Sequence, residues 1–91
     1  METIEVKHKH FSCKIGQRNE NCFVNVHTNF VPLEHNDFIQ AIRNSKIVEY
    51  IPNVADYGDG SGGMCIMITP MADEMDLYNE LERLMKLELL Y

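Results

Sequence analysis

Three of the four histidines have the spacing that comes closest to a site for chemistry. His8 and His10 lie two residues apart in a segment that alternates apolar and charged residues, and such residues on a strand point to the same face. If Ile15 pairs with Cys22 in a hairpin, His10 comes to lie opposite His27. Three imidazoles on adjacent strands match the ligands of a catalytic zinc site with an open fourth position, which would activate water for hydration or hydrolysis.

The surroundings of these histidines favour a simpler interpretation. Lys7 and Lys9 flank His8, and their positive charges oppose the binding of a dication. No nearby carboxylate is placed to hydrogen-bond and orient the imidazoles. We therefore expect solvated histidines and no cofactor, and we keep zinc at His8, His10 and His27 as an alternative.

A glycine-rich segment, 58–63, contains the GxGxxG pattern of dinucleotide-binding loops. In those sites the pattern opens a helix that receives the phosphates, whereas here an apolar strand follows and Asp59 would repel a phosphate. We expect a mobile hairpin loop. Binding of a small ligand or a nucleotide at Asp59, Gly60 and Ser61 is a further alternative.

The three cysteines have neither a disulfide pattern nor a catalytic setting. Their number is odd and no two have CxxC spacing, which favours reduced thiols in a cytoplasmic protein. Cys65 lies inside the apolar run from Met64 to Ile68, and Cys13 and Cys22 fall on the apolar side of the predicted hairpin, where a thiolate is disfavoured. The sequence also contains no Ser/His/Asp order, nucleophile elbow or paired-carboxylate motif. The sequence therefore favours a protein that is not an enzyme, although it does not decide between the two.

The elements that must position these residues follow the order ββαββα. Four strands are expected, over 4–15 with a bulge near 8–10, 22–28, 47–51 with 54–57 as a kinked extension, and 64–69. Helices are expected from Pro32 to Ser45, and from an N-cap at Thr69 to the C-terminus. The fold predicted is α+β, a single four-stranded antiparallel sheet with two helices on one face, as in a permuted ferredoxin-like plait. Because Met64 to Ile68 is uniformly apolar, the last strand is expected to be buried on both faces.

Length and charge limit the class of protein. Ninety-one residues suffice for one core, so a single domain over 1–91 is expected. The net charge of −6 disfavours direct binding to nucleic acid and favours a basic protein partner. No segment has the length and hydropathy of a membrane span or the pattern of a signal peptide, which predicts a cytoplasmic protein without a membrane partner.

The last predicted helix carries more apolar residues than one stripe can bury. Leu77, Leu81 and Leu84 form the stripe expected to face the sheet, whereas Leu87 and Leu90 lie on the opposite side. We expect a second copy to bury Leu87 and Leu90 in a homodimer; alternatively, the chain curls back or its last turn frays. The predicted partner-binding surface consists of Asp73, Asp76, Glu80, Leu87, Leu90 and Tyr91.

Together these features predict a small, acidic, non-enzymatic protein that regulates or inhibits a larger protein. Its size, acidity and lack of catalytic motifs resemble the broad class of phage or mobile-element inhibitor proteins, some of which occupy nucleic-acid-binding sites on their targets. The resemblance implies a protein target. Two alternatives stay open: a metal-dependent enzyme or sensor at the three histidines, and binding of a small ligand or nucleotide at the glycine-rich loop.

Overall fold

The computed structural model describes residues 3–90, which form six strands and two helices. Their order is β1 (Ile4–His8), β2 (Phe11–Ile15), β3 (Phe23–Thr28), α1 (Asp37–Arg43), β4 (Val48–Tyr50), β5 (Val54–Asp56), β6 (Gly62–Ile68) and α2 (Glu74–Lys86). All strands belong to one antiparallel sheet with the order β1-β2-β3-β6-β4, in which β5 also pairs with β6. The prediction of an α+β fold with a single antiparallel sheet and two helices is confirmed.

The prediction of four strands in a ferredoxin-like order is wrong. The chain reverses at Lys9 and His10, where Lys9 has a left-handed φ of 56°, so the expected bulged strand is a hairpin of β1 and β2. The change in alternation at this point therefore marks a reversal of direction and not a bulge. The segment after Pro52 is likewise a separate strand, β5, because proline has no N–H with which to continue the ladder.

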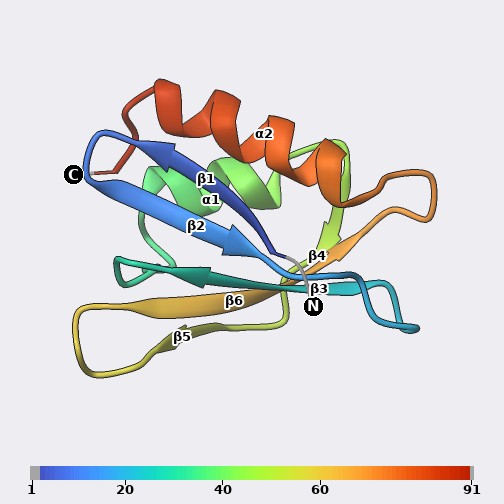
Figure 1. The fold of residues 1–91 in the computed structure, drawn as a ribbon, viewed down its shortest axis with the longest axis horizontal. Coiled ribbons are helices and arrows are strands. Elements are labelled where there is room, and N and C mark those ends of the chain that lie inside the picture. Colours follow the sequence, from blue (N-terminus) through green and yellow to red (C-terminus); the bar gives the residue numbers. More distant parts are fainter. Residues whose placement is uncertain (1–2, 91) are drawn as a thin grey trace.

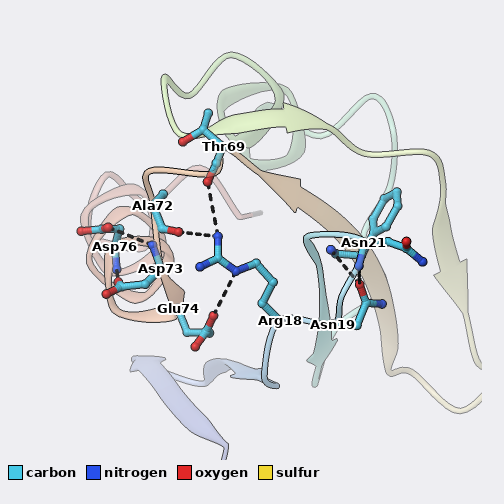
Figure 2. Close-up of polar contacts among 9 residues, drawn as sticks. Arg18, Asn19, Asn21, Thr69, Ala72, Asp73, Glu74 and Asp76 are labelled. Atoms are coloured by element: carbon cyan, nitrogen blue, oxygen red, sulfur yellow. Dashed lines mark hydrogen bonds and ion pairs between the residues drawn. The ribbon is translucent and has the colours of Figure 1, made fainter.

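The register between β2 and β3 differs by four residues from the predicted one. Ile15 pairs with Val26, and Lys14, in place of His10, lies opposite His27. The connecting loop is longer than a tight turn, and the side-chain oxygen of Asn19 orders it by accepting hydrogen bonds from the backbone N–H groups of Asn21 and Phe23 (Figure 2). A shift of four is even, so every side chain keeps its predicted face.

Both helices begin later than the sequence predicts. Asn36 caps α1 by accepting a hydrogen bond from the N–H of Phe38. Asp73 caps α2 through a capping box, in which Asp73 and Asp76 each accept a hydrogen bond from the other's backbone N–H (Figure 2). This reciprocal pair satisfies two helix-terminal donors, so Thr69 stays outside the helix in the preceding turn.

A single arginine ties the β2–β3 loop to the start of α2. One nitrogen of Arg18 donates to the carbonyl of Ala72 at 2.6 Å and to that of Thr69 at 3.4 Å (Figure 2). Its Nε lies 3.7 Å from a carboxylate oxygen of Glu74. Arg18 therefore fixes the turn that leads into α2.

Both helices pack on the same side of the sheet (Figure 1). Along β2 and β3, buried residues alternate with more exposed ones, and the buried ones join the helices in one hydrophobic core. The largest fully buried side chains include Ile15, Val24, Phe38, Ile66, Leu77 and Leu81. Within residues 3–90, neither helix has the length and hydropathy needed to cross a membrane. The opposite face of the sheet, called the open face below, carries no helix.

Candidate functional site

The three histidines predicted as metal ligands do not form a common site. His8 ends β1 on the side of the helices, His10 lies in the following turn, and His27 projects from the open face. The Nδ1 of His27 lies 2.9 Å from the hydroxyl of Tyr57. In the part of the chain that the structure describes, no group of three or more His, Cys, Asp or Glu side chains is placed to hold a metal ion.

The acidic residues predicted to bind a basic partner make contacts within the chain. Asp73 and Asp76 form the capping box of α2. Glu80 accepts hydrogen bonds from Arg83 at 2.7 Å and from the hydroxyl of Ser45. The hydrogen bond from Arg83, followed by that from Ser45, holds the pKa of Glu80 below its usual value. These three carboxylates therefore stabilise α2 and its contact with the loop before β4.

The prediction that Leu90 is buried by another chain is wrong. Helix α2 ends at Lys86, and Glu88 adopts a left-handed φ of 57°, which redirects the chain. Leu90 is consequently 8% exposed within its own chain, whereas Leu87 is 56% exposed. The alternative that the chain curls back accounts for Leu90. Tyr91 lies outside the described residues.

The predicted loop residues Asp59, Gly60 and Ser61 form the turn between β5 and β6. Asp59 accepts hydrogen bonds from the hydroxyl and, at 3.0 Å, the backbone N–H of Ser61, and these bonds lower the pKa of its carboxyl group. Gly58 and Gly60 adopt left-handed φ values of 83° and 88°, which glycine reaches without steric cost. The glycines and Asp59 thus have a conformational role in this hairpin.

Two of the three free cysteines have a raised thiol pKa, which lowers their reactivity. Burial raises the pKa of the Cys13 thiol to about 12. Desolvation also raises the pKa of Cys65. Because the thiolate is the nucleophilic form, neither thiol is activated for catalysis.

The buried Cys13 thiol predicts a loss of stability at alkaline pH. The folded protein keeps this thiol protonated to a pKa of about 12, whereas the unfolded chain ionises near 9.0. The contribution is therefore complete below pH 9 and is lost as the pH rises toward the folded pKa. Between pH 8 and pH 10, wild type should lose about 1.4 kcal/mol more than a Cys13→Ala variant, measured by urea unfolding. Equal losses would contradict this linkage.

An apolar row crosses three strands on the open face. Phe23 of β3 and Tyr50 of β4 both pair with Met67 of β6, and directly opposed residues share a face. Cys65 faces the same way and lies opposite Asn25. Phe23, Cys65 and Met67 are half-buried, and Tyr50 is 55% exposed. Strand β6 is thus apolar on both faces, although the helices cover only one of them.

A second row on the open face combines basic and aromatic groups. Lys14, His27 and Gly63 lie side by side on β2, β3 and β6. Tyr57 crosses over Gly63 to reach His27, and a Cβ at position 63 would collide with the tyrosine hydroxyl. Two depressions adjoin His27, one of about 510 Å³ that reaches Lys7 and Lys14 and one of about 180 Å³ that reaches Asn25, Asn53 and Cys65.

The sequence pattern does not mark Phe23, Tyr50 or Tyr57 as site residues. Phe23 lies on the side of β3 opposite its apolar alternation, Tyr50 belongs to a strand too short to show one, and Tyr57 follows an equally short strand, β5. The apolar run from Met64 to Ile68 is the signal that leads to them, since it predicts cover on both faces of that strand. Comparisons of the chain with protein-family models, with curated proteins and with solved structures find no match.

Proposed function

We propose that this chain is a non-enzymatic binding protein that docks a partner protein on the open face of its sheet and regulates or inhibits that partner by occupying part of its surface. One observation carries the proposal: β6 is apolar on both faces, and the helices cover one. The solvated face of an antiparallel sheet is ordinarily polar. Here Phe23, Met67 and Tyr50 form a continuous apolar row, which a docked partner would remove from water.

The charges beside this row favour a partner segment that carries carboxylates. Lys14 has no salt bridge among the described residues and lies next to His27. Lys7 lines the same depression and lies 3.5 Å from a carboxylate oxygen of Glu5, the one acidic residue among its described lining residues. This replaces the expectation of a basic partner, because the carboxylates predicted to bind it are engaged within the chain.

A protein segment fits this surface better than nucleic acid or a second copy of the chain. The net charge of −6 repels an extended polyanion at long range, whereas a few carboxylates among apolar residues meet the lysines without that cost. Two copies docked through their open faces would bring Lys7 and Lys14 of both chains together. Among the described residues that line this depression, Glu5 is the one carboxylate that offsets these like charges.

The test is affinity capture from the source cells with three tagged forms of the chain. The first is wild type, and the second carries Tyr50→Lys and Met67→Lys on the open face. The matched control carries Met71→Lys and Met75→Lys, since these residues are 94% and 50% exposed and lie in and before α2. Circular dichroism establishes that each form is folded.

We expect wild type and the control to retain the same partner, and the open-face variant to bind it at least about tenfold more weakly, because a central apolar contact is replaced by charge. Quantitative mass spectrometry identifies the partner, and a binding titration with the purified partner gives the dissociation constants. Equal binding by the open-face variant, equal loss in the control, or no partner for wild type would contradict the proposal.

A further inference from the structure

A cavity of about 250 Å³ lies where the β1–β2 turn meets the end of α2. Phe11, Met85 and Leu90 supply its apolar walls, and the polar side consists of His8, Lys9, His10 and Glu88. We propose that this cavity binds a small apolar molecule, about one aromatic ring in size, that carries a hydroxyl group. The proposal concerns a different site from the docking face, and its test is independent of any partner.

The walls of this cavity are held in place by the core. Met85 is 2% exposed and Leu90 is 8% exposed, so both are anchored among buried side chains. Phe11 packs edge-on against Phe30, with ring centroids 5.5 Å apart. An engineered apolar cavity of about 150 Å³ accommodates benzene, so the larger volume here admits a substituted ring.

An unsatisfied imidazole nitrogen marks where the polar group of the ligand would lie. The Nε2 of His8 is buried and makes no hydrogen bond, and no other side-chain atom within residues 3–90 shares this condition. Leaving such an atom unpaired costs free energy, so buried polar groups ordinarily have a partner. His8 lines the cavity, and a ligand's polar group reaches Nε2, which has almost no accessible surface of its own, when the neighbouring side chain of Glu88, 41% exposed, moves aside.

The carboxylate of Glu88 indicates that the polar group of the ligand is a hydroxyl group. Oε1 of Glu88 lies 3.7 Å from Nε2 of His8, too far for a hydrogen bond but close enough for one oxygen atom to lie about 2.8 Å from both. A hydroxyl would accept a hydrogen bond from Nε2–H of His8 and donate its own to Glu88. Lys9 pairs with Glu88 and lowers the pKa of its carboxyl group, which keeps it an acceptor.

Other ligand classes satisfy these groups less well. A ligand carboxylate would meet the like charge of Glu88, and Lys9, the lysine that lines the same cavity, already pairs with that carboxylate. A pure hydrocarbon would contact the apolar walls but leave Nε2 of His8 without a hydrogen bond. A neutral ring with one hydroxyl group matches both the walls and the two polar atoms.

The experiment titrates the 91-residue protein with phenol and, as the matched probe, benzene, followed by amide chemical shifts in NMR. Because benzene is the more apolar molecule, an apolar cavity alone would prefer it. We expect saturable shifts at 8–11 and 85–90, with phenol binding about 3- to 10-fold more tightly than benzene. Equal or tighter binding of benzene, or no saturable shift up to about 10 mM phenol, would overturn the proposal.

A pair of variants assigns the preference to His8. His8→Phe removes the hydrogen-bonding nitrogen while keeping a ring, and should abolish the preference for phenol. His35→Phe makes the same change at an exposed position before α1 and should retain that preference. A His8→Phe protein that still prefers phenol to the same degree would refute the role of this nitrogen, and the comparison of the two probes on wild type tests the site even if that variant fails to fold.

Discussion

Replacing Gly62 by alanine should lower the free energy of unfolding by about 3 kcal/mol, measured by urea denaturation followed by circular dichroism. A Cβ at this position would approach Cδ of Pro32 to 2.5 Å and the carbonyl oxygen of Ala55 more closely still. Neither neighbour is the end of a flexible side chain. Because Gly62 pairs with both Thr28 and Asp56, its backbone cannot move away without breaking the sheet on one side.

The matched control for this prediction is Gly60→Ala in the adjoining turn. Gly60 has a left-handed φ of 88°, and a Cβ there would meet nothing within 4 Å. Its substitution should therefore cost only the backbone strain, about 1 kcal/mol. If the two variants lost equal stability, steric packing would not explain why position 62 requires glycine. The comparison also separates a turn glycine from a packing glycine within the glycine-rich segment 58–63.

The inward faces of the central strands are predictable from the sequence, because hydrophobic alternation depends only on local order. Cys13, Ile15, Val24 and Val26 alternate with polar residues, and all four are buried. The register is not predictable in the same way, since shifts by even numbers preserve this pattern. The loop built around Asn19 selects the observed register, and that selection decides which residue faces His27.

The hairpin of β1 and β2 is missed because its turn lacks the usual sequence signal. Tight hairpin turns that need a positive φ are ordinarily marked by asparagine or glycine, whereas here lysine adopts it at Lys9. The end of α2 is missed for the same reason, because the positive φ that follows the helix is adopted by a glutamate, Glu88. The predicted zinc ligands His8 and His10 and the predicted dimer leucines Leu87 and Leu90 each flank one of these reversals, so neither pair has the relative placement that the sequence predicts.

The open face and the cavity depend on contacts between distant parts of the chain. The cavity joins residues near position 10 to residues near position 88, and no local pattern connects them. The unsatisfied nitrogen of His8 is equally invisible in the sequence, since it depends on what surrounds the ring. The apolar character of both faces of β6 is the one part of these sites that the sequence predicts, because it depends on five consecutive apolar residues, Met64 to Ile68.

Leu90→Lys should destabilise the protein by about 2–4 kcal/mol, whereas Leu87→Lys should change its stability by no more than about 0.5 kcal/mol. On a helix continued to the C-terminus the two leucines share a side and would respond alike. The left-handed residue Glu88 ends that equivalence, so that Leu90 is 8% and Leu87 56% exposed. Urea unfolding of the two single variants, which introduce the same charge three residues apart, measures the difference.

Light scattering at micromolar concentration completes this test. It distinguishes a chain that buries Leu90 in its own core from one that buries Leu87 and Leu90 against a second copy. If Leu90 belongs to the core of its own chain, Leu90→Lys weakens folding, and neither variant changes the molar mass. If both variants kept wild-type stability and instead converted a dimer to a monomer, both leucines would belong to an interface between copies. In that case α2 would continue past Lys86, and the cavity walled by Leu90 would not exist in solution.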